Sequence, residues 1–454
     1  DMRYQLSGDV SDESAQALGR QVGAEAIMSG SLTNLGAAYR FRIKVINVET
    51  AAIEAQFAFT VQNDAQTAYL LTGKMPEPAP APTPQPAPKP APVVTPASSG
   101  GMTQAASGLK STADWLAANA KAGGNYVITL DWNEQAPPLR FSYNNQNVTI
   151  TLKAAGGQRE VTFDTAAPSA PLFTVGAGVT LIIEENVVLK GLPEKSKPLV
   201  SVDGGAFTLN GGTLKDNKTS DNGGAVLVAG GGAFTMQGGA ITGNTSNKWG
   251  GGVFVTGGTF TMNSGAISGN TASSGDGGVF VTFSGSAFTM KGGTISSNTS
   301  SSGGGGVSVS TSGTFTMHNG AISGNTASSG GGVFVTFSGS GFTMQGGSIS
   351  GNTADNDGGG VSVAFSDSGF TMQGGAISGN TAGSGGGVSV FFSSAFTKSG
   401  ADGVIYGSDA PAGQANKAAR AAAVYVDDGR KRETTARTST ALDTQKSGPS
   451  GGWE

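Results

Sequence analysis

The chain has 454 residues, of which 75 are glycine, and only 13% are charged, about half the charged fraction of an ordinary globular protein. Its formal net charge of −4 favours neither nucleic acid nor an anionic membrane as a partner. It contains no cysteine, which excludes disulfide bonds, thiolate catalysis and cysteine-ligated metals in this sequence, and it has no run of about 18 apolar residues that would predict a membrane span.

Residues 1–72 predict a partial α/β domain. Residues 11–22 begin with Ser-Asp-Glu and are followed by Gly23, which predicts a short capped helix. Alternating apolar residues predict strands at 24–29, 39–45 and 53–61.

The string Val22-Gly-Ala-Glu-Ala-Ile-Met-Ser-Gly-Ser31, followed by Tyr39-Arg-Phe-Arg-Ile43, resembles the second half of a small α/β domain. That domain belongs to envelope lipoproteins of the curli-secretion and penicillin-binding-protein-activator type. The resemblance implies an exported envelope protein. Because the chain opens at Asp1 inside this domain, we expect a signal peptide or lipid-anchor cysteine to precede it.

A proline-rich linker is predicted at 73–108. Within it, residues 75–97 alternate proline with alanine, threonine, glutamine and lysine. Such a sequence favours a polyproline II spacer of about 3.1 Å per residue over a ligand for an SH3-like domain.

Residues 109–124 predict an amphipathic helix, from Ser111 to Lys121, that ends before a pair of glycines. We expect this helix to cap the open first coil of the repeat region that follows. Residues 125–206 predict irregular entry coils, with strands at 126–130, 148–152, 161–163, 172–175, 179–183 and 187–189.

The repeat region is predicted at 207–426 and is followed by a tail, 427–454, that we expect to be disordered. The phrase Phe-Thr-(Met/Leu/Lys) recurs every 26 to 28 residues, at Phe207, Phe234, Phe260, Phe288, Phe315, Phe342, Phe370 and Phe396. Each unit has three short apolar pieces of period two separated by glycine runs, a pattern of strands and not of helices. The sequence therefore predicts a mainly β fold: a right-handed single-stranded parallel β-helix of about 27 residues per coil.

Stacked coils place equivalent residues in columns about 4.8 Å apart. The inward columns are predicted to be the Phe and Met of Phe-Thr-Met, the valines of Val-x-Val, and the isoleucines at Ile241, Ile267, Ile295, Ile322, Ile349 and Ile377. A structural asparagine ladder is predicted at a bend, from Asn217, Asn244, Asn270, Asn298, Asn325, Asn352 and Asn380.

The Gly-Gly-Ala-Ile at 238–241 and 374–377, with its variant Gly-Gly-Thr-Ile at 292–295, resembles the repeat of chlamydial-type polymorphic outer-membrane proteins and related bacterial surface β-helices. The resemblance covers about residues 200–400. It departs from the family because Ile-Ser-Gly-Asn replaces the companion Phe-x-x-Asn motif. The family implies a surface-exposed, adhesive or antigenic protein.

Little chemistry is predicted in the repeats. The charged residues between Phe234 and Phe396 are Lys248, Asp276, Lys291, Asp355, Asp357 and Asp367. This set is too sparse for a catalytic groove, so we predict no enzyme, no cofactor and no metal site. Three competing hypotheses are a cation at Asp355 and Asp357, a role for the single His318, and an ice-binding face formed by the outward threonines of Phe-Thr-Met.

Strict alternation turns the middle residue of each Val-Phe-Val outward. Phe254, Phe280 and Phe334, with Trp249 nearby, are therefore predicted to form an exposed aromatic patch that binds a protein or a glycan. The competing hypothesis is that a loop folds over these rings.

These observations predict a non-enzymatic exported bacterial protein, at the outer membrane, cell surface or periplasm, that presents a repetitive β-helix for adhesion or molecular interaction. The expected partner is a protein or glycan ligand and not nucleic acid. Two further hypotheses are a pectin-lyase-like carbohydrate-active or carbohydrate-binding protein, and an envelope scaffold that acts through the N-terminal domain.

Overall fold

The computed structural model describes residues 26–34, 38–47, 53–62, 93–96, 104–105, 108–143, 147–194, 196–365, 367–408, 410–411 and 413–426. Its chain divides into two compact units, Asp1–Pro88 and Lys89–Glu454.

The first unit contains an antiparallel sheet of three strands in the order β1-β2-β3. They are β1 (Ala26–Asn34), β2 (Ala38–Asn47) and β3 (Ile53–Gln62), which confirms the three predicted strands and lengthens each of them. The predicted helix at 11–22 and the proline-rich residues 75–92 lie outside the described residues. The α/β class of this unit therefore stays a prediction.

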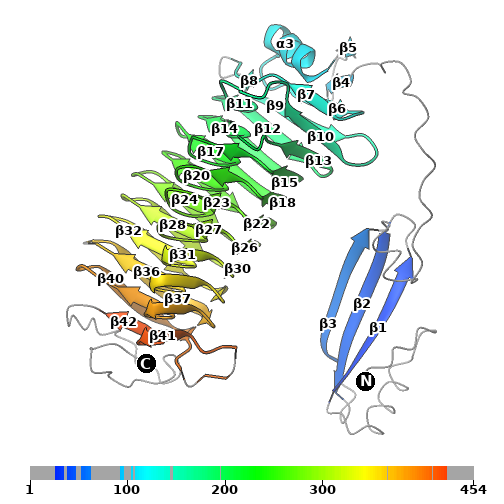
Figure 1. Cartoon of the computed structure of the whole chain (residues 1–454). Helices are drawn as coiled ribbons and strands as arrows, with labels where there is room; N and C mark the ends of the chain where they lie inside the picture. Colours follow the sequence, from blue (N-terminus) through cyan, green and yellow to red (C-terminus); the bar gives the residue numbers. More distant parts are fainter. Residues whose placement is uncertain are drawn as a thin grey trace. The chain divides into compact units, whose positions relative to one another are not determined.

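The second unit is a parallel β-solenoid whose coils stack in three sheets (Figure 1). The largest, the phenylalanine sheet, has 20 strands and carries the Phe-Thr-Met and Ala-Ile pieces. Its strands are β4 (Val93–Pro96), β5 (Gln104–Ala105), β6 (Asn125–Leu130), β7 (Glu134–Ala136), β9 (Val148–Ala154), β10 (Arg159–Phe163), β12 (Val179–Glu184), β13 (Val187–Lys190), β15 (Ala206–Lys215), β18 (Ala233–Thr242), β21 (Thr259–Met262), β22 (Ala266–Ser268), β25 (Ala287–Met290), β26 (Thr294–Ser296), β29 (Thr314–Met317), β30 (Ala321–Ser323), β33 (Gly341–Met344), β34 (Ser348–Ser350), β37 (Gly369–Ser378) and β40 (Ala395–Ile405).

The valine sheet has 11 strands and the short-strand sheet, which follows the asparagine column, has eight. The valine sheet contains β8 (Leu139–Phe141), β11 (Phe173–Gly176), β14 (Val200–Asp203), β17 (Val226–Ala229), β20 (Val253–Thr256), β24 (Val279–Thr282), β28 (Val307–Ser310), β32 (Val333–Thr336), β36 (Val361–Ala364), β39 (Val388–Val390) and β42 (Val424–Val426). The short-strand sheet contains β16 (Lys218–Thr219), β19 (Thr245–Ser246), β23 (Thr271–Ala272), β27 (Thr299–Ser300), β31 (Thr326–Ser329), β35 (Thr353–Asp357), β38 (Thr381–Ser384) and β41 (Lys417–Arg420).

The predicted columns are present. Each Phe of the repeat pairs with the Phe of the next coil, as Phe288 does with Phe315, and successive rings stack at 4.6 to 5.0 Å between centroids. The rings of Phe207 to Phe370 are 1% exposed, and the methionine, isoleucine and valine columns beside them are also buried. The core is therefore a set of stacked identical side chains, since parallel in-register pairing places like above like.

The asparagine column is a continuous hydrogen-bonded ladder. The backbone N–H and the side-chain Nδ2 of Asn325 both donate to Oδ1 of Asn352, at 3.0 and 2.9 Å, and Nδ2 also donates to the carbonyl of Ile295. The ladder extends one coil beyond the prediction, because Asn380 donates in the same way to Asn416. All these asparagines are at most 1% exposed, so the ladder satisfies polar groups that the bend buries.

Glycine is required where the chain turns from the short-strand sheet into the valine sheet. At Gly330 the φ angle is +60°, in the left-handed region. Two residues later, a Cβ on Gly332 would lie 2.6 Å from the carbonyl oxygen of Gly360 in the next coil. The glycine runs therefore permit close stacking of coils as well as the turn.

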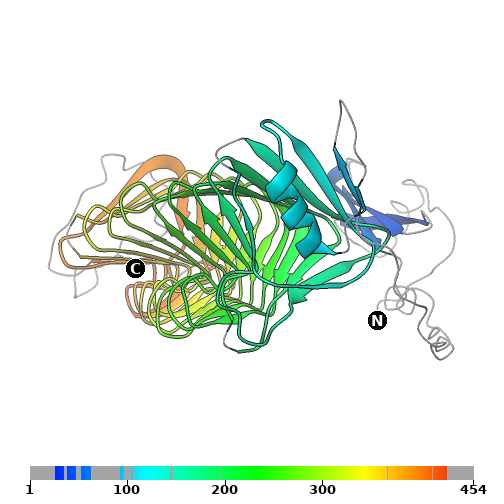
Figure 2. The same ribbon diagram turned by 90° about the horizontal axis from the view of Figure 1, so that it is seen from above.

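The first coils differ from the predicted boundaries. Helix α3 spans Leu109–Asn119 and buries Leu109, Ala113 and Leu116 in the solenoid core beside β7 and β8 (Figure 2). The predicted linker at 73–108 is wrong at its C-terminal part, because β4 pairs antiparallel with β6 and with β5. Its apolar Val93 and Val94 add a strand to the edge of the first coil. The capping role of α3 and the right hand of the coil stay predictions.

The six predicted entry strands are found, as β6, β9, β10, β11, β12 and β13. Three more short strands that were not predicted, β7, β8 and β14, lie between them and the first full repeat or beside them in the same coils.

Candidate functional site

The predicted aromatic patch is not a continuous exposed surface. Phe254 and Phe280 are only 5% and 6% exposed, which corrects the expectation that they face solvent. Phe334 is half-buried, and Trp249 is 45% exposed. Strict alternation does turn these side chains away from the core of the solenoid, but other residues cover Phe254 and Phe280 and separate them from solvent.

The glycine-rich loops that lead into the valine sheet cover its outer face. The indole of Trp249 stacks on the ring of Phe280 with 6.1 Å between ring centroids, and the centroids of Phe280 and Phe254 are 5.5 Å apart. A Cβ on Gly303 would clash with the ring of Phe334, so that loop passes directly over the ring. The competing hypothesis, a loop folded over the rings, is therefore the correct one for Phe254 and Phe280.

A buried carboxylate holds this cover in place. Asp276 accepts hydrogen bonds from the backbone N–H of Gly303, at 2.7 Å, and from Oγ of Ser308, at 3.2 Å. Burial raises the pKa of Asp276 above its ordinary value of 3.8, although these hydrogen bonds oppose the rise. Asp276 therefore acts as a structural tie between two loops and the valine sheet.

The residues predicted for a cation site, a histidine role or an ice-binding face form no cluster of ligands. His318 is exposed in the bend that follows β29, and on β35 Asp355 is exposed while Asp357 is half-buried. Within the described ranges, no three His, Cys, Asp or Glu side chains are arranged to hold a metal ion. The threonines that follow the core phenylalanines are half-buried.

A different set of aromatic side chains is exposed. We call it the turn-phenylalanine row, and its rings are 55%, 51%, 42% and 56% exposed at Phe283, Phe337, Phe365 and Phe392 respectively. Each residue lies one or two positions after the end of a valine-sheet strand, where the chain turns toward the phenylalanine sheet. The four strands are β24, β32, β36 and β39. Because the coils stack in register, these positions form one line along the solenoid.

The row is built on a backbone conformation that phenylalanine disfavours. The φ angles at Phe283, Phe337, Phe365 and Phe392 are +69°, +60°, +73° and +50°. A bulky residue in this left-handed region costs about 1–2 kcal/mol. The two preceding coils have glycine at left-handed positions of the same turn, with φ of +60° at Gly230 and +64° at Gly257. The turn itself therefore does not require an aromatic side chain.

Buried serines hold the turns beneath the rings. Oγ of Ser340 donates to the carbonyl of Thr336 at 2.7 Å, and Oγ of Ser368 donates to the carbonyl of Ala364 at 2.8 Å. Ser286 makes the same contact with the carbonyl of Thr282. Each hydroxyl fixes the residue before the exposed Phe, so the rings are presented on a rigid backbone.

Three rings of the row stack on one another. Phe337 and Phe365 lie 5.1 Å apart with an interplanar angle of 8°, and Phe365 and Phe392 lie 5.3 Å apart at 23°. This exposed stack copies the spacing of the core column but faces solvent. Because soluble proteins seldom expose clustered aromatic rings, the row is the strongest candidate for a contact surface.

Sequence reasoning missed the row because these residues lie after the strands, where alternation no longer assigns a side. One signal was available. The string Thr-Phe-Ser-Gly-Ser occurs at both 282–286 and 336–340, and it places an aromatic residue directly before turn-forming residues.

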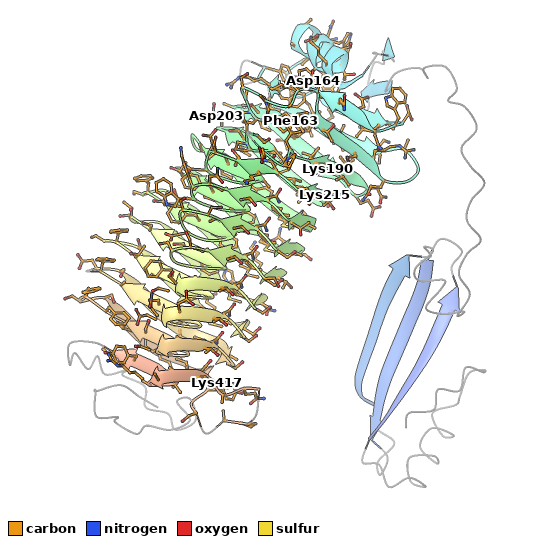
Figure 3. The ribbon with its side chains drawn as sticks, in the orientation of Figure 1. Phe163, Asp164, Lys190, Asp203, Lys215 and Lys417 are labelled. Atoms are coloured by element: carbon orange, nitrogen blue, oxygen red, sulfur yellow. The ribbon has the colours of Figure 1, made fainter. Side chains whose placement is uncertain are left out.

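Charged side chains gather instead on the first coils, where Figure 3 labels Lys190, Asp203 and Lys215. Lys190 pairs with Glu160 at 3.7 Å, and Asp203 pairs with Arg140 at 3.6 Å. These pairs are largely exposed and contribute little to stability.

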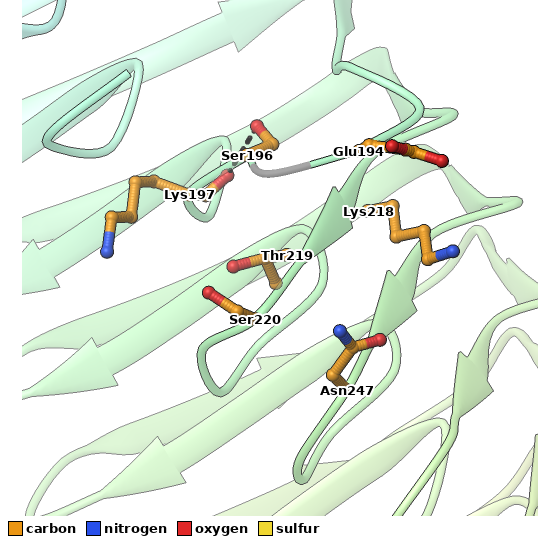
Figure 4. Close-up of a pocket in the computed structure, with 7 residues that line it drawn as sticks. All are labelled: Glu194, Ser196, Lys197, Lys218, Thr219, Ser220 and Asn247. Carbon is orange, nitrogen blue, oxygen red and sulfur yellow. Dashed lines mark hydrogen bonds between the residues drawn. The ribbon is translucent and has the colours of Figure 1, made fainter. Parts of the chain in front are cut away.

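A polar pocket of about 450 Å³ opens beside the short-strand sheet at these coils (Figure 4). Near it, Lys197 pairs with Asp221 at 2.7 Å, and Lys248 lies 4.0 Å from the same carboxylate. The pocket is lined by Glu194, Ser196, Lys197, Lys218, Thr219, Ser220 and Asn247. It has hydroxyl, amide and charged groups but no aromatic wall, so it offers polar contacts without a surface for ring stacking.

At the start of α3, Glu134 provides a cap from outside the helix. Its Oε2 accepts the backbone N–H of Leu109 at 2.8 Å, while Oε1 is buried without a hydrogen-bond partner in the described part of the chain. Burial raises the pKa of Glu134 above its ordinary value of 4.5, and the hydrogen bond from Leu109 opposes this rise.

No protein-family model, curated protein or solved structure matches this chain. In the regions that the structure describes, no helix is both long and apolar enough to span a bilayer.

Proposed function

We propose that this chain is a non-enzymatic binding protein of the bacterial envelope or cell surface, and that its β-solenoid presents the turn-phenylalanine row to a protein or glycan ligand. The observation that carries the proposal is the exposure of Phe283, Phe337, Phe365 and Phe392 in left-handed turns where glycine suffices in other coils. The family resemblance of the repeats supports the surface location.

The energetics support a binding role for these rings. Each ring leaves on the order of 100 Å² of apolar surface in water, and covering that surface would contribute about 2–3 kcal/mol. The left-handed backbone adds a cost of about 1–2 kcal/mol per residue that folding alone would avoid by using glycine. A ligand that covers the rings would offset both costs.

The binding hypothesis is tested with a row variant. Asparagine tolerates left-handed φ, so Phe337→Asn, Phe365→Asn and Phe392→Asn together should keep the turns and remove the rings. We expect the triple variant to lose at least about tenfold in affinity for any ligand found on a glycan and matrix-protein array. Unchanged affinity would remove the row from the function.

Trp249 provides a second arm, because it is exposed on a loop at the other end of the valine-sheet strands. Trp249→Asn should leave the affinity unchanged if the row is the contact surface. An equal loss in this variant and none in the row variant would move the binding site to the Trp249 loop.

The location is tested separately. Intact cells that express the full-length protein should bind antibody raised against residues 207–426 without permeabilisation. Antibody binding only after lysis would contradict display on the surface.

A further inference from the structure

The turn-phenylalanine row is interrupted at one coil. Thr282 pairs with Ser310, and Ser310 pairs with Thr336, so Phe283, Thr311 and Phe337 occupy the same position in three successive coils. Thr311 has a φ of +48°, in the same left-handed region as its two neighbours. The left-handed φ is therefore repeated at this position, in a turn that is one residue shorter, while the aromatic ring is missing from the middle coil.

The missing ring leaves a gap of defined thickness. Parallel strands are spaced by about 4.8 Å, so Phe283 and Phe337 are separated by about 9.6 Å along the stack. A planar ring midway would lie about 4.8 Å from each. Phe337 and Phe365 themselves stack at 5.1 Å, and the core rings stack at 4.6 to 5.0 Å. A six-membered ring inserted midway would therefore take the spacing that the molecule already uses.

Hydroxyl groups form the floor and the rim of this gap. Thr311 and Ser312 are exposed, and Oγ1 of Thr311 lies 3.1 Å from Oγ of Ser310. Oγ of Ser312 donates to the carbonyl of Ser338 at 3.3 Å, which joins the floor to the coil of Phe337. Exposed Ser284 and Ser338 follow the two aromatic residues.

The composition of the gap selects a ligand class. Residues 283–286, 311–313 and 337–340 contain no charged side chain, which disfavours an ionic ligand. Two aromatic walls suit a ring whose faces present C–H bonds, because the face of a benzene ring is negative. The hydroxyl floor suits a ring that carries hydroxyl groups at its edge. A pyranose has both properties, because its hydroxyl groups can hydrogen-bond to Oγ1 of Thr311 and Oγ of Ser312 in addition to the contacts that these atoms already make, whereas the phenyl ring of a partner's side chain carries no such groups.

We infer that the gap between Phe283 and Phe337 is a binding slot for one pyranose ring of a glycan, sandwiched between the two phenylalanine rings and hydrogen-bonded by the hydroxyls of Thr311 and Ser312. This inference rests on the proposed function, in which the row is the contact surface, and specifies the ligand class at one position of it.

The test fills the slot. Thr311→Phe would complete the aromatic row. The turn accepts this residue because Phe392 and Ser393, with φ of +50° and +63°, have the same conformation as Thr311 and Ser312, with φ of +48° and +63°. The matched control is Trp249→Asn, which removes an exposed aromatic ring outside the row. A further variant, Phe392→Asn, removes a ring of the row two coils away from the slot and separates the slot from the rest of the row. Saturation-transfer NMR and calorimetry on the full chain would use methyl β-glucopyranoside, cellotetraose and tetra-N-acetylchitotetraose as probes, with p-cresol as the aromatic probe.

We expect at least one saccharide to bind, and we expect Thr311→Phe and Phe283→Asn each to weaken its binding by at least about tenfold while Trp249→Asn leaves it unchanged. The pyranose assignment is overturned if no saccharide binds at about 10 mM, or if only p-cresol binds in a way that Thr311→Phe blocks. Equal weakening by Phe392→Asn, with no effect of Thr311→Phe, would overturn the slot but keep the row as a binding surface. If the triple row variant also retains every ligand found on the array, the proposed function fails with it.

Discussion

Two lines of phenylalanine rings run along the same solenoid, one inside and one outside. The core column stacks at 4.6 to 5.0 Å, and the three adjacent rings of the turn row stack at 5.1 and 5.3 Å. Rings of the core column from Phe207 to Phe370 are 1% exposed on strands, whereas the turn row is 42% to 56% exposed in left-handed turns. Phenylalanine rings at nearly the same spacing therefore have two roles. Those of the core column stabilise the fold, whereas those of the turn row are accessible to a ligand.

The largest expected contrast is in stability. Phe315→Ala removes a fully buried ring and leaves a cavity between two neighbours, so we expect a loss of about 3–5 kcal/mol of unfolding free energy. Phe365→Ala removes a half-exposed ring and should cost less than about 1 kcal/mol. Urea denaturation followed by circular dichroism measures both. Similar losses in the two variants would mean that the outer row is part of the core.

Contact between neighbouring coils also constrains the backbone more tightly at some glycines than at others. A Cβ on Gly332 would meet the carbonyl of Gly360 at 2.6 Å and Cγ2 of Ile349 at 2.8 Å, whereas a Cβ on Gly341 would meet nothing within 4 Å. Gly332→Ala should therefore destabilise the solenoid by about 1–3 kcal/mol through overpacking. Gly341→Ala, at the start of β33, serves as the control and should change stability by no more than about 0.5 kcal/mol. The same denaturation measurement would contradict close coil stacking if both variants behaved alike.

The core could be predicted from the sequence because repetition fixes register. Once Phe288 and Phe315 are recognised as equivalent, the isoleucine, valine and asparagine columns follow by counting. Asn416 could not be found by counting, because it lies 36 residues after Asn380 and the coil between them is longer than the other repeats. Its place in the ladder is recognised only from the hydrogen bonds that Asn380 donates to its Oδ1 in the structure.

The contact surface could not be predicted in the same way. Period-two alternation correctly turned Phe254 outward but carries no information about the loop that covers it. Phe337 lies one residue past its strand, and its left-handed φ contradicts the steric preference of phenylalanine. Sequence rules follow such preferences, so they miss positions where the backbone is strained.

That strain can be measured at the isolated member of the row. Phe283 has φ of +69° and follows a coil in which glycine occupies the turn. Phe283→Gly should relieve about 1–2 kcal/mol of left-handed strain, against about 0.5–1 kcal/mol of added chain entropy in the unfolded state. We expect a gain in stability of up to about 1 kcal/mol, while binding at the slot is lost. A variant that is both less stable and fully able to bind would contradict the separation between the two rows.

The two regions should also differ in their response to pH. Burial raises the pKa values of Glu134 and Asp276, so both carboxyl groups bind protons more tightly in the folded chain than in the unfolded one. The contribution of these two groups to stability should therefore be fully present below their ordinary values of 4.5 and 3.8, and it should be lost as pH rises through their raised pKa values. Thermal unfolding across this range should show the trend, and Glu134→Gln with Asp276→Asn should flatten it. Residues 283–286, 311–313 and 337–340 contain no titratable side chain, so ligand affinity of the slot should stay constant over the same range. A parallel change in affinity would show that binding depends on the loops tied by Asp276.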